Sequence, residues 1–242
     1  MKILVTGHEG FIGSHVSEHL KSLGYEVEGL SFPDDIENFK GNFKGGNYGL
    51  IIHLAAFANI RGSLDNPDVF WENNVEKSKP LFEWCRQTNT RILYASSSAV
   101  HEWWINPYAI TKKLNEIQAP PNSVGMRFFN VWSEKGSRND MLYRMLQENT
   151  AKYLTRHRRD WIHVHDVARA ICFLMPDKYR GVIDVGTGKP TSVLELAEKM
   201  GKGNLPIKED TPGERDETCA DTTELTKLGW HPTINILDFA SP

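Results

Sequence analysis

The sequence predicts an α/β protein with a doubly wound parallel sheet. Short apolar runs alternate with longer segments whose apolar residues recur at helical spacing, the pattern of strand–helix–strand units. The first apolar run stands at the start of the chain, and a glycine-rich turn follows it. The 242 residues, 40% of them hydrophobic, are enough to bury one full core with a small lobe appended to it.

Six apolar runs are the expected strands, and six segments between or after them are the expected helices. The strands fall at residues 2–7, 26–30, 49–55, 91–97, 124–130 and 181–186. The helices fall at residues 14–23, 68–87, 108–118, 141–147, 164–175 and 192–200. Pro80 lies inside the second helix, where a proline costs about 3 kcal/mol, so we expect a kink or two separate helices there.

Charge and cysteine content argue against several classes of protein. A net charge of -3 provides no basic surface for a nucleic acid backbone, so nucleic acid is not an expected partner. The sequence has no signal pattern and no apolar run of membrane-span length, and its three cysteines lie too far apart for a disulfide framework or a zinc site. We therefore expect a cytoplasmic protein that does not bind a membrane.

Two histidines, His163 and His165, alternate in the segment WIHVHD and raise the question of a metal site. No third ligand stands at a recognisable spacing, and a hydrogen-bonded core histidine is the commoner case. We expect no metal.

The segment VTGHEGFIGS carries the first chemical motif. Gly7, Gly10 and Gly13 follow the first strand and open the first helix. Glycines at these places let the backbone turn tightly and approach a pyrophosphate, while the helix N-terminus presents unpaired N–H groups to the anion. A tight turn without a ligand is the alternative, but the position at the start of an alternating α/β chain favours dinucleotide binding.

The stretch YASSSAVHEWWINPYAITKK carries the second motif. Three serines close the fourth expected strand, and Tyr108 and Lys112 stand one helical turn apart. A phenol with an ordinary pKa of about 10 is a poor base at neutral pH, but an ammonium one turn away favours its phenolate. The alternative is an incidental pair on an amphipathic helix; the glycine turn and the serine-ended strand before it favour a catalytic base.

Eight segments, taken in order, carry a resemblance to one family. They are the glycine motif, HLAA, the serine cluster, Tyr108-x-x-x-Lys112, RFFNV, RDWIHVHDVARA, VGTGKPTSVLELA and LGWHP. Together they resemble the extended short-chain dehydrogenase/reductases of the NAD-dependent nucleotide-sugar epimerase/dehydratase family. The resemblance implies a Rossmann-type domain, residues 1–126 completed by about 159–186, and a smaller nucleotide-sugar-binding lobe, residues 127–158 and 187–242. The chain is shorter than typical members.

The resemblance implies roles for the second motif. Tyr108 would take a proton from a sugar hydroxyl while a hydride passes to a nicotinamide, and Lys112 would also hold the nicotinamide ribose. Ser97, four residues before His101, matches the acting hydroxyl; Ser98 is the alternative and an expected substrate contact. His101 departs from the tyrosine of the family pattern, and we favour a partly buried aromatic over a substrate contact.

The implied cofactor is NAD, with NADP as the alternative. Its expected contacts are Gly7, Gly10, Phe11, Ile12, Gly13, Ser31, Asp35, Leu54, Ala55, Ala56, Asn74 and Lys112. Ser31 stands where an acid that binds the adenosine ribose is usual. NAD is favoured because no arginine follows to hold a 2′-phosphate, and Asp34 and Asp35 would repel one.

The implied substrate is a nucleotide-diphosphate sugar. Asn130 and Arg159 match groups that contact the diphosphate, and Glu214 matches the acid near the nucleotide ribose. The alternative for Arg159 is a surface charge paired with Asp160.

Two further departures from the family pattern concern the substrate pocket. Thr211 stands where an arginine is usual, and three cations are candidates to compensate for it: Lys208, Arg215 and the cluster at Arg156. The interval from Ser97 to Tyr108 is also short, so the pocket is expected to be looser, or closed by Trp103 and Trp104.

The same resemblance favours one reaction. Ala99 stands where sugar dehydratases of the family carry an acid, so elimination is disfavoured. C4 epimerisation through a transient 4-keto sugar is the simplest assignment; a 4-ketoreductase, a dehydratase and a catalytically silent NAD-binding protein are the alternatives. The segment RFFNVWSEKGSRNDM is similar to uronate epimerases, although Trp132-Ser133-Glu134 departs from their Y-G-P. A homodimer joined by residues 68–87 and the Tyr108 helix is also implied.

Overall fold

The structure is a computed structural model that describes residues 1–30, 47–135, 141–209 and 211–241. Two of the expected cofactor contacts, Ser31 and Asp35, lie outside the described residues.

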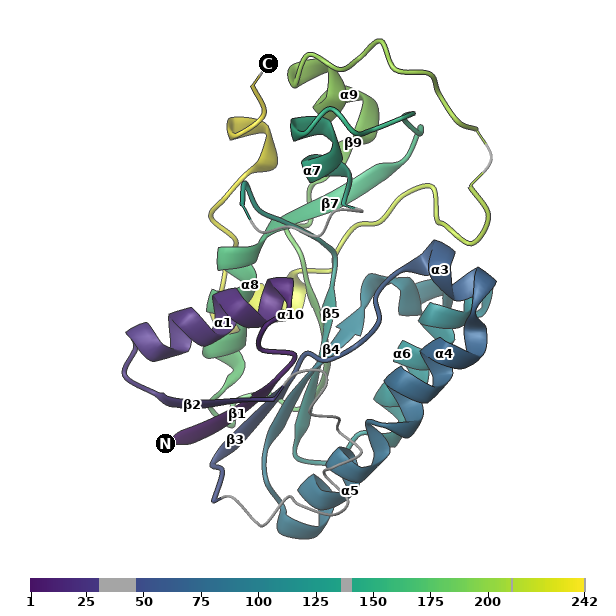
Figure 1. Ribbon diagram of the computed structural model, residues 1–242. Helices are drawn as coiled ribbons and strands as arrows, with labels where there is room; N and C mark the ends of the chain where they lie inside the picture. The colour runs from purple at the N-terminus through teal and green to yellow at the C-terminus, as the bar shows by residue number, and fades with distance from the viewer. Residues whose placement is uncertain (31–46, 136–140, 210, 242) are drawn as a thin grey trace.

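The main sheet confirms the predicted α/β fold. Its six strands run in the order β2-β1-β3-β4-β5-β8, and every neighbouring pair is parallel (Figure 1). The bounds are β1 Lys2–Thr6, β2 Glu26–Leu30, β3 Leu50–His53, β4 Ile92–Ser97, β5 Ser123–Phe128 and β8 Gly181–Val185. All six predicted strands are therefore present, the fifth ending at Phe128, two residues before its predicted end.

Both faces of the main sheet are covered by helices, which explains why β1 and β3 are almost continuously apolar. Ile3 and Val5 of β1 belong to the core shared with α1 (Phe11–Ser22), α8 (Val164–Leu174) and α10 (Thr223–Leu228). Leu4, between them, belongs to the core that α5 (Lys79–Thr88) forms on the other face. Figure 1 shows α4 (Pro67–Trp71) and α6 (Pro107–Gln118) on the same face as α5.

Pro80 separates two helices, as expected. A π-helical turn, Glu72–Glu76, follows α4, and α5 begins at Lys79 with Pro80 in its first turn. A proline costs little there, because the N–H groups of a first helical turn have no intrahelical acceptor. None of the helices in the described segments combines the length and apolar character needed to cross a membrane.

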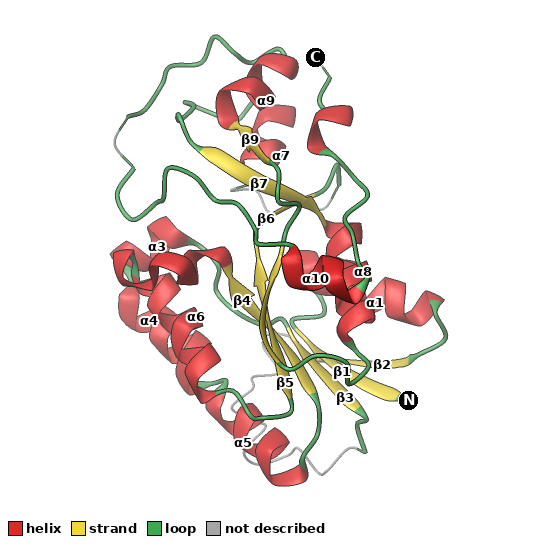
Figure 2. Cartoon of the chain, turned by 180° about the vertical axis from the view of Figure 1, so that it is seen from behind, coloured by secondary structure: helices red, strands yellow, loops and turns green. Residues whose placement is uncertain are grey.

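A small lobe lies beyond the carboxyl ends of the main strands (Figure 2). It contains the sheet β6-β7-β9, with β6 at Asn130–Trp132, β7 at Arg158–His163 and β9 at Pro190–Ser192. The lobe also holds α7 (Leu142–Gln147), α9 (Val193–Lys199) and a short 3-10 helix, Ile236–Asp238. Its own core includes Trp132, Tyr143, Leu146 and Trp161. The exact division of the chain into residues 1–126 with 159–186 and 127–158 with 187–242 stays a prediction.

The order of the strands fixes where a ligand can bind. β2 lies on one side of β1 and all later strands of the main sheet lie on the other, so the order in which strands are added reverses between β1 and β3. Ligands of open parallel sheets bind at such a switch point, outside the carboxyl ends of the strands. The glycine turn after β1 and the loop after β3 meet there, and Phe128 of β5 leads directly into the small lobe.

Candidate active site

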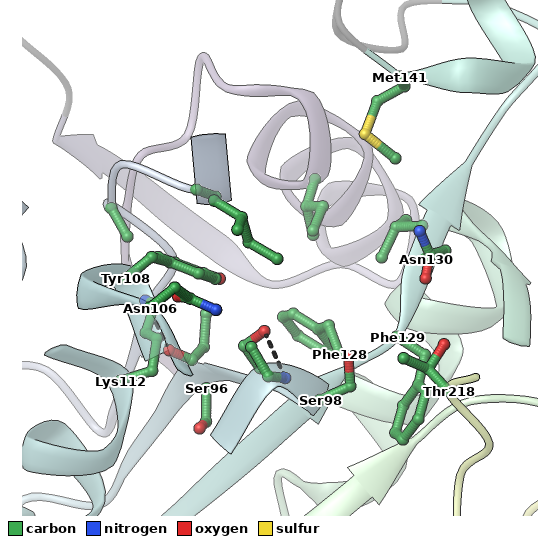
Figure 3. A pocket seen from close by; sticks show the side chains of 18 of the residues that line it. Ser96, Ser98, Asn106, Tyr108, Lys112, Phe128, Phe129, Asn130, Met141 and Thr218 are labelled. Atoms are coloured by element: carbon green, nitrogen blue, oxygen red, sulfur yellow. Dashed lines mark hydrogen bonds between the residues drawn. The ribbon is translucent and has the colours of Figure 1, made fainter. Parts of the chain in front are cut away.

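A pocket of ≈ 370 Å³ opens at the switch point, between the main sheet and the small lobe (Figure 3). It brings together fourteen of the sequence-predicted residues: Gly7, Gly10, Phe11, Ile12, Gly13, Leu54, Ala56, Ser97, Ser98, Tyr108, Lys112, Asn130, Arg159 and Glu214. These residues come from seven separate segments of the chain, so the fold, rather than the sequence, makes them neighbours.

The glycine turn fits a bound pyrophosphate. Gly7 has φ of +70°, and a Cβ on Gly13 would lie 2.0 Å from the carbonyl oxygen of Gly7, so both positions require glycine. α1 begins at Phe11, directly after Gly10, and the N–H groups of its first turn have no intrahelical acceptor. The pocket wall is therefore backbone that an anion can approach closely.

Ala55 and Asn74 do not line the pocket, unlike the other described residues predicted to contact the cofactor. The backbone N–H of Ala55 donates to Thr6 Oγ1 at 3.3 Å. Asn74, fully buried, accepts from the N–H of Phe57 at 2.8 Å and donates to the carbonyl oxygen of Phe57 at 2.9 Å and to Thr111 Oγ1 at 3.1 Å. Asn74 thus fixes the loop after β3 to α6 and holds the pocket wall rather than forming its surface.

His53, at the end of β3, forms a buried hydrogen-bond chain behind the pocket. Its Nδ1 lies 2.7 Å from Thr6 Oγ1 and its Nε2 lies 3.0 Å from Ser78 Oγ. Burial, with a smaller effect of the Lys112 cation, lowers the pKa of His53 to about 3. The imidazole is therefore neutral, and it joins β1, β3 and the start of α5.

Two of the three serines at the end of β4, Ser96 and Ser97, have different hydrogen-bond partners. Ser96 Oγ donates to Glu116 Oε1 at 2.7 Å, and the same carboxylate accepts two hydrogen bonds from Arg127. Ser97 Oγ accepts from the N–H of Ala99 at 3.2 Å and so caps the 3-10 segment Ser98–Ile105. Because that bond uses an oxygen lone pair, the Ser97 hydroxyl proton is available to donate to a ligand in the pocket.

Tyr108 and Lys112 lie on one face of α6, both almost fully buried. The helix begins where the Asn106 side chain accepts from the N–H of Ala109 at 2.7 Å, and the N–H of Tyr108 donates to Ser63 Oγ at 3.1 Å. Figure 3 shows the Tyr108 hydroxyl pointing into the pocket, with Lys112 below it in that view, one turn further along α6. Burial lowers the pKa of Lys112 to about 8, so its ammonium persists at neutral pH.

Charged groups gather at the small-lobe end of the pocket. Arg159 donates to Glu214 Oε2 at 3.4 Å and to the backbone oxygen of Asp216 at 3.1 Å. The alternative in which Arg159 is a surface charge paired with Asp160 is wrong, because Arg159 is buried. The Asp160 carboxylate is buried as well, and it accepts hydrogen bonds from the backbone N–H groups of Thr187, Gly188 and Ala220.

Sequence reasoning missed Arg61, on the short helix α3 (Ile60–Asp65). Its Nε donates to Glu214 Oε1 at 2.7 Å, and its Nη1 donates to the Tyr153 hydroxyl at 2.6 Å. No local pattern marks this residue, because its partners stand 92 and 153 positions later in the chain.

Thr211 stands where the family pattern has an arginine, and the cations that could compensate for its absence have different surroundings. Of Lys208, Arg215 and Arg156, only Arg215 lines the pocket, and its Nε donates to Glu102 at 3.0 Å. Lys208 lies over the Tyr153 ring, and the exposed Arg156 pairs with Glu209. Trp103 and Trp104 do not line the pocket and are largely exposed, so they do not close it.

His101 and His163 each lie within hydrogen-bonding distance of a carboxylate. His101 Nε2 lies 3.0 Å from Asp184 Oδ2, beside the Phe129 ring. His163 is buried against Trp132, and its Nε2 lies 2.9 Å from Glu134 Oε2. Within the described parts of the chain, no three or more His, Cys, Asp or Glu side chains are grouped so that they could hold a metal ion.

The chain belongs to the NAD dependent epimerase/dehydratase family, whose model matches residues 3–186. Protein CapI of Staphylococcus aureus is 28% identical, over 98% of this chain and 96% of that protein. UDP-glucuronate 4-epimerase 4 of Arabidopsis thaliana is 30% identical, over 97% of this chain and 72% of that protein.

Solved structures agree with the family assignment. MoeE5 in complex with UDP-glucuronic acid and NAD is 25% identical and superposes with a TM-score of 0.85, covering 100% of this chain and 97% of that one. The alignment with CapI spans 320 positions although this chain has 242 residues, so the shortening expected from the sequence is internal.

Proposed function

We propose that this protein is an NAD-dependent nucleotide-sugar epimerase that inverts C4 through a transient 4-keto sugar. The observation that carries the proposal is the meeting of Tyr108, Lys112 and Ser97 with the glycine turn in one pocket. A base, an ammonium and a hydroxyl donor beside a pyrophosphate site are the groups that oxidation of a sugar alcohol requires.

The Tyr108 phenolate removes the proton of the sugar hydroxyl. The buried Lys112 ammonium stabilises that phenolate, and the Ser97 hydroxyl donates to the same sugar oxygen. NAD, when bound, supplies reversible acceptance of a hydride. Tyr108 would return the proton to the same oxygen as the hydride is returned to the opposite face of the 4-keto sugar, which inverts the configuration at C4.

Gly7, Gly10 and Gly13 with the first turn of α1 would hold the cofactor pyrophosphate, and Leu54 and Ala56 would line its channel. Lys112 would hold the nicotinamide ribose. We keep NAD rather than NADP, because MoeE5 is solved with NAD beside UDP-glucuronic acid and beside UDP-glucose.

Arg159 and Asn130 would contact the substrate diphosphate, and Glu214 the nucleotide ribose. Ser98, which lines the pocket beside Ser97, would contact the sugar. UDP-glucuronic acid and UDP-glucose are the first substrates to test, since MoeE5 is solved with both.

Epimerisation is favoured over dehydration because the part of the pocket that the structure describes offers no free carboxylate that could remove a ring proton. Ala99 lines the pocket, and among the described residues of the lining Glu214 is the single carboxylate. That carboxylate is bound by Arg61 and Arg159, so it is poorly placed to remove a ring proton.

We also propose that the protein is a homodimer and lies in the cytoplasm. Val69, Trp71 and Ile117 expose apolar side chains on α4 and α6, the helices expected to join a homodimer. Cys85, Cys172 and Cys219 are free thiols, which fits a reducing cytoplasm. Light scattering of the purified protein measures its oligomeric state.

Mass spectrometry of the purified protein, followed by NMR of reactions with UDP-, GDP- and dTDP-sugars, tests the proposal. Retained NAD and a C4 epimer formed without net cofactor consumption are expected. Consumption of NADH with a keto-sugar would identify a ketoreductase, a stable keto product a dehydratase, and binding without turnover a silent NAD-binding protein.

A further inference from the structure

Three consecutive residues at the rim of the pocket are each bonded to the main-sheet side of the molecule. The carbonyl oxygen of Gly213 accepts from Asn106 Nδ2 at 2.9 Å, and Glu214 accepts from Arg61 Nε at 2.7 Å. Arg215 Nε donates to Glu102 Oε1 at 3.0 Å. All three rim residues line the pocket, so these bonds fasten one of its walls to α3, to the 3-10 segment Ser98–Ile105 and to the start of α6.

Asn106 and Glu102 each bond one residue of the rim. Arg61, on α3, joins two further segments, those of Glu214 and Tyr153. Its Nε is bonded to Glu214 and its Nη1 to the Tyr153 hydroxyl, while the guanidinium lies 5.7 Å from the centroid of the Tyr153 ring. Tyr153 belongs to the small lobe and Arg61 to α3, so the side chain bridges the two sides of the pocket mouth. A lysine has a single terminal nitrogen and lacks this planar fork.

Glu214 stands between Arg61 and a cation that lines the pocket. Its Oε1 accepts from Arg61, whereas its Oε2 lies 3.4 Å from Arg159 Nη2 and 3.6 Å from His157 Nδ1. The Arg159 bond is the longer of the two guanidinium contacts. Glu214 is therefore bound more closely by Arg61 than by Arg159, which leaves the charge of Arg159 less completely neutralised and able to act on an anion in the pocket.

We propose that Arg61 is a positioning residue for the substrate diphosphate: by holding Glu214, it keeps the 213–215 rim closed and leaves Arg159 available for the phosphates. This inference rests on the proposed function, because it assumes that a nucleotide diphosphate occupies the pocket. Arg61 does not line the pocket, so it acts through Glu214.

Calorimetric titration of the NAD-loaded protein with UDP, GDP and dTDP tests the proposal. For the diphosphate that binds best, Arg61→Gln should raise Kd about three- to tenfold, and Arg61→Lys by less, since it keeps the charge but loses the fork. KM for the sugar nucleotide should rise equally while kcat changes less than about twofold. Arg180→Gln is the matched control: Arg180 is similarly exposed, pairs with Asp177 and lies outside the pocket lining.

A double-mutant cycle separates positioning from a general structural effect. In a Glu214→Gln background, Arg61→Gln should have no further effect on Kd, because its partner is already neutral. An unchanged Kd in Arg61→Gln, or an equal effect in both backgrounds, would overturn this inference and leave the proposed function standing. Failure of the wild-type protein to bind any of the three diphosphates would instead overturn the proposed function and this inference with it.

Discussion

The Lys112 ammonium donates a hydrogen bond of 2.9 Å to the carbonyl oxygen of Ala95, the residue directly before the three serines. This bond ties α6 to the end of β4, so the amine beside Tyr108 and the hydroxyl of Ser97 are held in one geometry. A buried lysine loses solvation, which lowers its pKa to about 8 and leaves the ammonium largely intact at neutral pH.

Lys112→Met should lower kcat by at least about 100-fold, because Tyr108 loses the cation that favours its phenolate. NAD retention should fall as well, since the proposed ribose contact is lost. Turnover and mass spectrometry of the purified variant measure both effects. Lys113→Met, which removes the adjacent and more exposed lysine, should keep turnover within about threefold of wild type; an equal loss in both variants would count against a specific role for Lys112.

Two serine variants decide which hydroxyl acts. Ser97→Ala should reduce kcat about 10- to 100-fold, because the proposed donor to the sugar oxygen disappears. Ser98→Ala should act mainly on KM. Ser96→Ala should spare turnover by comparison and instead lower stability, since it removes a donor from the buried Glu116. A larger kcat loss in Ser98→Ala than in Ser97→Ala would reassign the role.

Gly13→Ala should abolish NAD retention. The added Cβ would stand 2.0 Å from the carbonyl oxygen of Gly7 and 2.9 Å from His8 Cα, so the phosphate-binding turn must move. Gly203→Ala is the control, because its Cβ would come no closer than 3.5 Å to another atom. The cofactor content of each purified variant is the measurement, and wild-type NAD content in Gly13→Ala would contradict the assignment of the turn.

Acid should weaken the fold through His53. The unfolded chain binds a proton there near the ordinary pKa of 6.5, whereas burial keeps the folded side chain neutral down to about 3. The contribution of neutral His53 to the free energy of unfolding is therefore complete above about pH 6.5. It is lost as the pH falls from 6.5 toward 3, by about 1.4 kcal/mol per pH unit.

Urea unfolding at about pH 7 and pH 5 measures this dependence. His53→Asn should reduce the difference between the two free energies of unfolding by about 2 kcal/mol, whereas the exposed His231→Asn should leave it unchanged. An identical pH dependence in His53→Asn and wild type would rule out His53 as its source.

The sequence predicted those parts of the fold whose signal is local. Ile3, Leu4 and Val5 are buried on alternate faces of the main sheet, and such continuous apolar runs marked β1 and β3. β7 was missed because its sequence, RRDWIH, begins with three charged residues. Asp160 in that strand is fully buried, but its N–H partners lie 27 to 60 positions away, where no local pattern can show them.

The same distinction applies to the pocket. The glycine turn, the serines and the Tyr108 helix were recognisable because each is a contiguous motif. Arg61 was not, since only the folded chain brings α3 against Glu214. Sequence alone could not separate two roles for Asn74: a residue that fixes a loop and one that contacts a cofactor look alike in sequence. The hydrogen bonds of Asn74 to Phe57 and Thr111 indicate that it fixes a loop.

The catalytic rate of Tyr108→Phe, measured on protein that still retains NAD, tests the central claim most directly. The substitution removes only the phenolic oxygen, so the fold and the cofactor content should persist while C4 epimerisation falls to the background of the uncatalysed reaction. Epimerisation at a rate near that of wild type would show that another group moves the proton, and would contradict the assignment of Tyr108 as the base.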